Sequence, residues 1–262
     1  MNLTISCLQI NIAFGDPEKN FKQVSQEIEK TVITSKPDII VLPELWTTGY
    51  DLTRLDEIAD ENGAVSMKFL SELAKKYSVN LVGGSIAKKV KENVTNTMFT
   101  FNREGHLIHE YSKAHLFQLM DEHLYLKGGN KTGLFTLENI PSAGMICYDI
   151  RFPEWLRAHT TKGAQVLYVV AEWPLARLYH WRSLLIARAI ENQCYVVACN
   201  RAGADLKNAF AGHSMIIDPW GEIIAEGSEE PETITAEIDL NKVIEVRKQI
   251  PIFNDRRKEL YD

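Results

Sequence analysis

Hydrophobic residues along the chain follow two spacings, one typical of buried strands and one typical of amphipathic helices. Residues 3–10 alternate apolar and polar side chains, which predicts a first strand. In residues 17–34 the apolar side chains recur every three or four positions, which predicts a helix, and Pro17 suits its first turn. Residues 38–43 are almost entirely apolar and predict a fully buried strand.

The same alternation of helices and strands continues through the rest of the chain. Helices are predicted at 64–77, from 153, at 180–192 and from 241, and strands at 80–85, 95–102, 107–111, 133–137, 143–148, 166–170, 195–200, 214–218, 222–226 and 233–238. This order predicts an α/β fold with the sheet inside and the helices outside. Because no repeat or linker is visible, we expect a single domain over 1–262.

Composition and charge exclude several classes of protein. With 262 residues and 45% hydrophobic content, the chain can bury a large core. The formal net charge is −6 and no long basic run is present, so we expect no nucleic-acid partner. The first residues do not resemble a signal peptide and no apolar run is long enough to span a bilayer, so no membrane partner is expected. The four cysteines form no CxxC pair, which favours a cytoplasmic protein.

Cys147 is the first candidate for chemistry. It ends an apolar run and is followed by polar residues and by Pro153, which signals the start of a helix. Backbone N–H groups and the helix dipole at such a strand exit would lower the pKa of a thiol and favour the nucleophilic thiolate. The alternative is a buried, inert cysteine, which is the expected state of Cys7, Cys194 and Cys199 inside their strand-like segments.

A cysteine hydrolase also needs a proton acceptor and a cation. Glu44 follows an apolar strand and Pro43, so it is expected at the mouth of that strand, where partial burial would raise its pKa. Lys113 ends another strand-like segment, although a surface lysine is the simpler interpretation of that pattern. His115 offers a competing Cys–His mechanism. No histidine has metal-ligand spacing, so no metal site is expected.

Three segments around these candidates resemble a known family. LPELWTTGY, YSKAHLF and CYDIRFPEW are similar, in this order, to the three signature blocks of the nitrilase superfamily of carbon–nitrogen hydrolases. The resemblance extends from Ile5 to about Asp255, and FQLMDEHLYLKGGN and AEWPLARLYHWRSLLIARAIENQ are most similar to its omega-amidase branch. The resemblance implies a four-layer α-β-β-α sandwich that assembles as a homodimer or a larger homo-oligomer.

The resemblance also implies a role for each matching residue. Glu44 matches the general base, Lys113 the cation that stabilises the oxyanion, and Cys147 the nucleophile. Glu122 matches a second glutamate that orients or balances the lysine, the alternative being a loop carboxylate like its neighbour Asp121. Three further roles are implied, the backbone N–H of Tyr148 as second oxyanion donor, Arg151 as a buried ion-pair partner and His115 as a packing or hydrogen-bonding residue.

The implied substrate pocket is defined less sharply. Glu172 and Trp173 match a position that lines the family's pocket, although some relatives have Asn where Glu172 stands. A second carboxylate on the substrate would need a cation, for which Arg177 and Arg201 are candidates, with surface roles as the alternative for each. Aromatic walls could come from Phe117, Tyr50 and Trp173, unless these rings belong to the core.

The implied reaction is hydrolysis of a small omega-monoamide such as 2-oxoglutaramate through a cysteine thioester, with release of ammonia and without a cofactor. Lys113 beside Glu44 would keep the carboxylate ionised, against the effect of burial. An amidase acting on deaminated glutathione, an N-carbamoyl compound or a nitrile is a second interpretation. A non-catalytic scaffold is a third, against which the intact Glu44, Lys113 and Cys147 argue.

Overall fold

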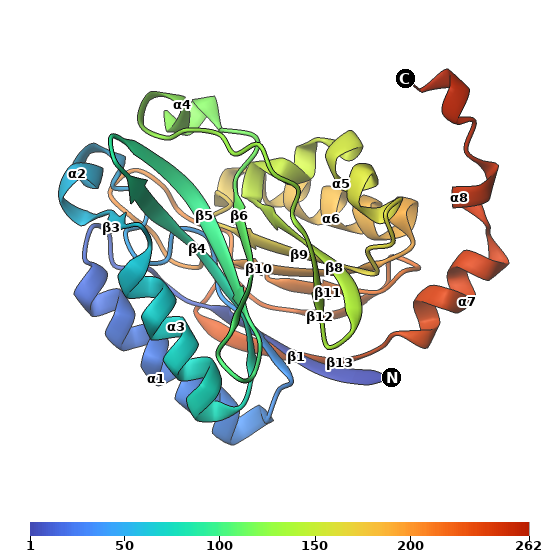
Figure 1. Cartoon of the computed structure of the whole chain (residues 1–262), viewed down its shortest axis with the longest axis horizontal. Helices are drawn as coiled ribbons and strands as arrows, with labels where there is room; N and C mark the ends of the chain where they lie inside the picture. Colours follow the sequence, from blue (N-terminus) through green and yellow to red (C-terminus); the bar gives the residue numbers. More distant parts are fainter. Residues whose placement is uncertain (262) are drawn as a thin grey trace.

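Two β-sheets pack face to face between two layers of helices in the computed structural model, which describes residues 1–261 (Figure 1). The first sheet has the order β13-β1-β2-β4-β5-β6, with β3 paired to β4. Its strands are β1 (Asn2–Gln9), β2 (Ile39–Val41), β3 (Asp60–Glu61), β4 (Asn80–Val90), β5 (Asn93–Phe101), β6 (Leu107–Ser112) and β13 (Glu232–Asp239).

The second sheet has the order β12-β11-β10-β9-β8-β7. Its strands are β7 (Leu134–Leu137), β8 (Ile140–Ile146), β9 (Val166–Ala171), β10 (Tyr195–Asn200), β11 (Met215–Ile217) and β12 (Ile223–Glu226). In each sheet three neighbouring strands are parallel, β1-β2-β4 in the first and β8-β9-β10 in the second. The carboxyl ends of parallel strands lie at one edge of a sheet, where active sites of α/β proteins commonly form.

Helices cover the outer face of each sheet (Figure 1). The first sheet is covered by α1 (Pro17–Ser35) and α3 (Ala64–Tyr77), and the second by α5 (Pro153–Thr160) and α6 (Leu178–Asn192). The remaining helices are α2 (Leu55–Ile58), α4 (Glu122–Tyr125), α7 (Asn241–Gln249) and α8 (Ile252–Asp255), and the 3₁₀ turns are η1 (Leu52–Arg54), η2 (Gln118–Met120), η3 (Cys147–Arg151), η4 (Leu175–Arg177) and η5 (Lys258–Leu260).

The core follows the alternation of side chains along the strands. In β1, Ile5 and Cys7 belong to the cluster between the two sheets, whereas Leu8 packs on the helices of the first layer. In β2, Ile39 and Val41 likewise face the second sheet, and Ile40 faces the helices. The four-layer sandwich expected from the sequence is therefore confirmed.

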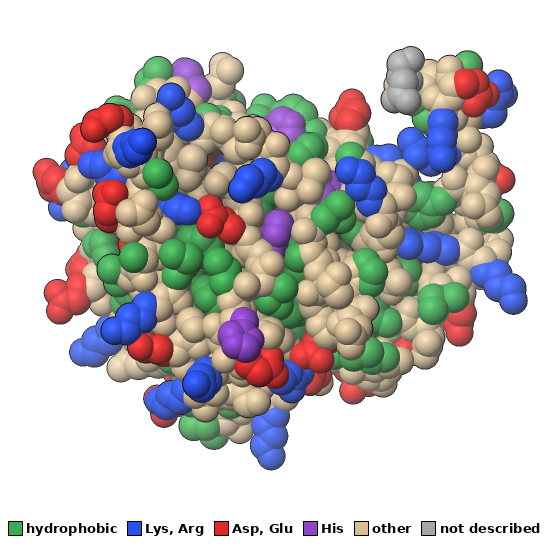
Figure 2. Space-filling model, viewed as in Figure 1, with side chains coloured by type: hydrophobic (Ala, Val, Ile, Leu, Met, Phe, Trp, Pro, Cys, Tyr) green, Lys and Arg blue, Asp and Glu red, His purple; other side chains and the backbone are tan. Residues whose placement is uncertain are grey.

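Most predicted elements are confirmed to within a few residues, with one correction. The strand predicted to run through residue 148 ends at Ile146, and Cys147 begins the turn η3. After α7, the chain forms α8 and η5 in an arm that projects from the sandwich (Figure 1). Figure 2 shows basic and acidic side chains interspersed over one face of the molecule. Among residues 1–261, no helix combines the length and apolarity needed to cross a membrane.

Candidate active site

Ends of strands from both sheets meet at one buried cluster of charged side chains. Glu44 follows β2 and Lys113 follows β6 in the first sheet, while Cys147 follows β8 and Glu172 follows β9 in the second. The backbone N–H of Glu172 donates to Oε2 of Glu44 at 2.9 Å, which connects the two sheets at this point. The site therefore depends on the packing of one sheet against the other.

Lys113 is shared by two carboxylates. Its Nζ lies 2.7 Å from Oε1 of Glu44 and 2.6 Å from Oε1 of Glu122, and all three side chains are fully buried. The other oxygen of Glu122 accepts the backbone N–H of Phe117 at 2.6 Å, which fixes the carboxylate. Glu122 therefore contacts the lysine as predicted and is not a solvated loop residue like Asp121, which is exposed.

Two polar side chains beside Lys113 were not predicted as hydrogen-bond donors to the glutamates. Asn96 on β5 donates its Nδ2 to Oε1 of Glu44 at 2.8 Å. Tyr50 Oη lies 2.7 Å from Oε1 of Glu122 and 3.2 Å from Oε1 of Glu44, so its proton is directed at the nearer carboxylate. Asn96 is a polar residue in a strand, between residues that are mostly buried. This pattern alone does not identify its hydrogen-bond partner.

Cys147 occupies a strained turn. Its φ is +45°, in the left-handed region that a non-glycine residue adopts only at an energetic cost. The turn is held by Asp149, whose Oδ2 accepts the backbone N–H of Ile146 at 3.0 Å and the hydroxyl of Tyr111 at 2.7 Å. The other oxygen, Oδ1, accepts the backbone N–H of His115 at 3.1 Å and contacts its Nδ1 at 2.7 Å. His115 thus supports the turn, as the family resemblance implied.

The protonation of Cys147 differs from the expectation of a lowered pKa. Burial, followed by the negative charge of Glu44, raises the pKa of the thiol well above its usual value of 9.0, and the positive charge of Lys113 opposes this only in part. The thiol is therefore protonated at rest. The sulfur, Glu44, Lys113 and Glu122 lie close enough for these charges to act on the thiol, so the structure brings the predicted residues together.

The lysine and the tyrosine keep their protons. Burial alone would lower the pKa of Lys113, but Glu122 and Glu44 outweigh it and raise the pKa well above 10.5. Burial and the same two carboxylates raise the pKa of Tyr50 well above 10.0. Burial also raises the pKa of Glu122, against the effect of Lys113. Lys113 is thus a permanent cation beside the carboxylates. The Cys147 thiol loses its proton only by transfer to a neighbouring group.

A small pocket opens next to Cys147. It is lined by Phe117, Met120, Cys147, Tyr148, Arg151, Glu172, Trp173, Pro174 and Arg177. Phe117 and Trp173 line it as predicted. Tyr50 does not, because its hydroxyl is engaged with the two glutamates.

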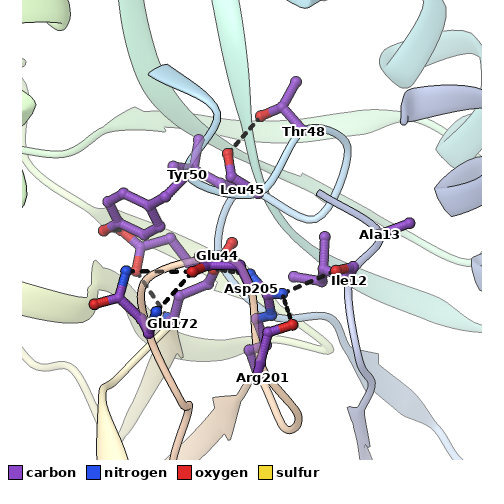
Figure 3. Close-up of polar contacts among 12 residues, drawn as sticks. Ile12, Ala13, Glu44, Leu45, Thr48, Tyr50, Glu172, Arg201 and Asp205 are labelled. Carbon is purple, nitrogen blue, oxygen red and sulfur yellow. Dashed lines mark hydrogen bonds and ion pairs between the residues drawn. The ribbon is translucent and has the colours of Figure 1, made fainter. Parts of the chain in front are cut away.

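Glu172 is bound to an arginine inside the protein. Oε2 of Glu172 lies 2.6 Å from Nη1 of Arg201, whose Nη2 donates to the carbonyl of Ile12 at 2.9 Å (Figure 3). Arg201 is fully buried and Asp205 lies 3.8 Å from it, so the surface role considered for this arginine is wrong. Burial raises the pKa of Glu172 to about 8, although Arg201 lowers it. Oε1 of Glu172 has no hydrogen-bond partner among residues 1–261.

Arg151 also differs from its predicted role. It was expected as a buried ion-pair partner, but it is half-buried, lines the pocket and makes no ion pair within residues 1–261. Its guanidinium lies 4.7 Å from the centre of the Trp173 ring. The turn around Cys147 is stabilised instead by Arg188, which was not predicted and donates its Nε to the carbonyl of Ile150 at 2.9 Å.

The arrangement suits acyl transfer. A thiol, a carboxylate that can accept its proton and a fixed ammonium that can stabilise an oxyanion meet beside a small pocket. No group of His, Cys, Asp and Glu side chains in the part of the chain that the structure describes is suited to hold a metal ion. The backbone N–H of Tyr148, expected as a second oxyanion donor, follows the nucleophile in the same turn.

Comparisons with known proteins agree with this chemistry. A model of the carbon–nitrogen hydrolase family matches residues 4–248. A 2-oxoglutaramate amidase of Bacillus subtilis (strain 168) is 58% identical over 261 residues, which cover 100% of both chains. An omega-amidase of Escherichia coli (strain K12) is 35% identical over 256 residues, covering 97% of this chain and 96% of the relative.

The fold matches a solved structure over almost its full length. A CN-hydrolase superfamily protein of Xanthomonas campestris, solved with an arsenic adduct in its active site, superposes with a TM-score of 0.91 and 29% sequence identity. The superposition covers 98% of this chain and 97% of the other. The similarity therefore includes both sheets and the helices that cover them.

Proposed function

The chain belongs to the carbon–nitrogen hydrolase family, and on this premise we propose that it uses Cys147, Glu44 and Lys113 to hydrolyse the terminal amide of a small omega-monoamide such as 2-oxoglutaramate. The observation that supports this most strongly is the Lys113 ammonium, 2.7 Å from Glu44 and within charge range of the buried Cys147 thiol. Burying opposite charges is costly, and neither a surface lysine nor an inert cysteine would explain why the protein does so here.

In the first half of the reaction, the sulfur of Cys147 attacks the amide carbon while Glu44 accepts the thiol proton. Because the pKa of the thiol is raised, this transfer accompanies the attack and does not precede substrate binding. The tetrahedral oxyanion rests against Lys113 and the backbone N–H of Tyr148, and such a donor contributes about 3 kcal/mol. The C–N bond then breaks, Glu44 returns the proton to nitrogen, and ammonia leaves behind a thioester.

In the second half, water hydrolyses the thioester. Glu44 accepts one proton from the water as its oxygen attacks the thioester carbon, and the same cation and N–H stabilise the second oxyanion. The C–S bond breaks, the thiol of Cys147 recovers its proton and the carboxylic acid is released. Glu122 holds Lys113 in place and Asn96 holds Glu44 in place throughout, and no cofactor takes part.

The substrate follows from the relatives and from the pocket. The Bacillus subtilis relative is named a 2-oxoglutaramate amidase, and the identity to it extends over the whole chain. Glu172 and Trp173 line the pocket next to Cys147, and we propose that they contact the substrate. The pocket beside Cys147 is small, which suits a short-chain monoamide better than a bulky peptide amide.

Hydrolysis of a panel of substrates tests this function. The proposal predicts that purified protein hydrolyses 2-oxoglutaramate and 2-oxosuccinamate, measured by ammonia release, faster than an N-carbamoyl compound or a nitrile, and faster than deaminated glutathione, measured by release of its dipeptide amine. Faster turnover of the nitrile would indicate a nitrilase. If the folded protein hydrolyses no member of the panel, the scaffold interpretation is favoured and the proposed function is wrong.

We further propose a cytoplasmic homo-oligomer. The four cysteines are buried and unpaired among residues 1–261, which suits a reducing compartment. The arm from α7 to η5 projects from the sandwich and exposes Ile244, Ile250, Leu260 and Tyr261, apolar side chains that a second copy could cover (Figure 1). Light scattering with size-exclusion chromatography tests this assembly, and a mass of one chain, 29.8 kDa, would contradict it.

A further inference from the structure

Glu172 has a carboxylate oxygen without a hydrogen-bond partner. Among residues 1–261, it is the one acidic residue that lines the pocket beside Cys147. Its Oε1 is buried, and no donor within this part of the chain reaches it. Most buried polar atoms in folded proteins are hydrogen-bonded, because a buried oxygen without a donor has lost its contacts with water. The free oxygen therefore indicates a ligand that carries a hydrogen-bond donor.

Arg201 fixes the orientation of this carboxylate. Nη1 of Arg201 donates to Oε2 of Glu172 at 2.6 Å, and both side chains are fully buried (Figure 3). The arginine is held in turn, because its Nη2 donates to the carbonyl of Ile12 at 2.9 Å and its guanidinium carbon lies 4.1 Å from the centre of the Phe210 ring. One oxygen of Glu172 is therefore bound inside the protein, and the other is left for a ligand.

The two oxygens of Glu44, the proposed base, have different surroundings. Oε1 lies 2.7 Å from Nζ of Lys113, 2.8 Å from Nδ2 of Asn96 and 3.2 Å from Oη of Tyr50. Oε2 accepts one hydrogen bond within residues 1–261, from the backbone N–H of Glu172 at 2.9 Å. A carboxylate oxygen can accept more than one hydrogen, so Oε2 still has a lone pair for a proton. A nitrogen that receives its proton from this oxygen therefore lies beside Glu172.

We propose that Oε1 of Glu172 accepts a hydrogen bond from the leaving nitrogen and thereby makes the site selective for amides over esters. This inference rests on the proposed function, in which Glu44 gives its proton to this nitrogen. When the C–N bond breaks, its electron pair stays on nitrogen, the proton comes from Glu44, and an N–H already present remains bonded to Glu172. An amide nitrogen carries hydrogens for this bond, whereas the leaving oxygen of an ester carries none.

The hydrogen bond requires the ionised form of Glu172. Because Arg201 donates to Oε2, a proton on this carboxyl group lies on Oε1 and turns the acceptor into a donor. Burial raises the pKa of Glu172 to about 8, with Arg201 lowering it and Glu44 and Asp205 raising it further. We therefore expect the preference for amides to be weak below this pH and to increase until Glu172 is fully ionised.

A comparison of two substrates separates Glu172 from the other titratable groups around it. Glutaramate and monomethyl glutarate share one acyl group and differ in the leaving group, which is ammonia or methanol. The charged and titratable neighbours of Glu172 act on both substrates, so the ratio of the two kcat/KM values isolates the leaving group. These neighbours include Glu44, Tyr50, Cys147, Arg151, Arg201 and Asp205.

Glu172→Gln reverses the polarity of the free position. Arg201 is a donor and keeps the oxygen of the glutamine, so the amide NH₂ group takes the place of Oε1 and meets the N–H of the substrate. Release of glutarate, measured by chromatography at about pH 9 and corrected for hydrolysis without enzyme, gives kcat/KM for both substrates. We expect the amide-to-ester ratio to fall by about 10- to 100-fold relative to the wild type.

Glu138→Gln is the matched control. Like Glu172, Glu138 binds an arginine at 2.6 Å, in this case Arg103, but it does not line the pocket. The amide-to-ester ratio of this variant should equal that of the wild type. An effect confined to Glu172→Gln therefore belongs to the pocket and not to the loss of an ion pair as such.

The pH dependence of the wild type tests the same role without a variant, and it decides the case if Glu172→Gln misfolds. Between about pH 6.5 and pH 9 the ionised fraction of Glu172 increases, so the amide-to-ester ratio should rise about 10-fold or more. In folded Glu172→Gln the ratio should stay constant over this range, because the titrating group is absent.

The inference and the proposed function fail in different ways. If the wild-type ratio is the same at both pH values, the role of Glu172 is wrong and the amidase stands. The same conclusion follows if folded Glu172→Gln loses activity equally toward the amide and the ester, since Glu172 then only maintains the site. If the wild type hydrolyses neither substrate, the proposed function is wrong and this inference falls with it.

Discussion

The environment of Lys113 in the structure differs from the one that its sequence pattern predicts. By pattern alone it is a surface lysine, yet it is fully buried between Glu44 and Glu122. Burying an ammonium costs several kcal/mol unless opposite charges and hydrogen bonds compensate. The two carboxylates supply this compensation. Removing either one should therefore destabilise the buried ammonium of Lys113 more than removing an exposed charge would.

Glu122→Gln tests the role of the second glutamate. The variant keeps the side chain's size but removes one of the two negative charges on Lys113, so the ammonium is less well positioned for the oxyanion. We expect kcat to fall roughly 10- to 100-fold, equivalent to about 1.4–2.8 kcal/mol. Asp121→Asn, at the exposed neighbouring position, should retain the wild-type kcat. Equal kcat values for the two variants would show that Glu122 is an ordinary loop carboxylate.

The raised pKa of Glu172 predicts that the stability of the folded protein depends on pH. Its folded pKa is raised to about 8, against a usual value of 4.5, so between these pH values the folded state keeps a proton that the unfolded state has released. The unfolded state then binds fewer protons, and the contribution of this group to the free energy of unfolding falls as pH rises, by up to about 1.4 kcal/mol per unit.

This decrease in the free energy of unfolding is complete near pH 8, because above that pH Glu172 is ionised in both the folded and the unfolded state. In Glu172→Gln this titration is absent, so its free energy of unfolding should fall less steeply from about pH 5 to pH 8. Urea denaturation at about pH 5, 6.5 and 8 measures both slopes. Parallel slopes for the wild type and the variant would contradict the raised pKa.

At the scale of elements, the turn from β8 into η3 decides where the nucleophile lies. Periodicity predicted the strand and the helix that begins at Pro153, because both depend on local spacing of apolar residues. It placed the strand end at residue 148, two residues late, because the turn is formed by long-range contacts of Asp149 with Tyr111 and His115. Such contacts leave no periodic signal in the sequence.

Asp149→Asn tests the contribution of this turn. An amide replaces one oxygen of a buried carboxylate that accepts hydrogen bonds from Ile146, Tyr111 and His115, and it turns a donor toward other donors. We expect the free energy of unfolding to fall by about 2–4 kcal/mol and ammonia release to fall with it. Tyr111→Phe removes one of these bonds and should cost about 1 kcal/mol in urea denaturation. A larger loss in Tyr111→Phe than in Asp149→Asn would argue against this role of the aspartate.

At the scale of the whole molecule, the site exists only because two sheets pack together. The matching segments identify the family from the amino-acid sequence alone, and with it Glu44, Lys113, Cys147 and Glu122. Neither Asn96 nor the pairing of Glu172 with Arg201 could be predicted, since each is a contact between distant segments whose residues have no distinctive local pattern. The same holds for Arg151, which makes no ion pair within residues 1–261, because only the tertiary arrangement decides which charges meet.

Gly144 on β8 is a point of close approach between the sheets. A Cβ at this position would lie 1.9 Å from Cε of Met98 on β5 of the other sheet. We expect Gly144→Ala to lower the free energy of unfolding by about 1 kcal/mol, at the low end of overpacking effects, because the clashing atom ends a flexible side chain. Met98→Ala alone leaves a cavity and should cost about 2–5 kcal/mol.

The double variant tests whether these effects share one cause. Alanine at 98 removes the atoms that clash with alanine at 144, so the loss in the double variant should be smaller than the sum of the single losses. Urea denaturation of the wild type, both single variants and the double variant measures the difference. Strict additivity would show that the two residues do not meet between the sheets.

Cys147 must be the residue that attacks the amide if the proposed function is right. Ammonia release from 2-oxoglutaramate by the wild type, Cys147→Ala and Cys194→Ala tests this most directly, because Cys194 is a buried cysteine outside the site. Circular dichroism confirms that each variant is folded. We predict no ammonia above background from Cys147→Ala and near wild-type release from Cys194→Ala. Wild-type release from folded Cys147→Ala would contradict the proposed mechanism.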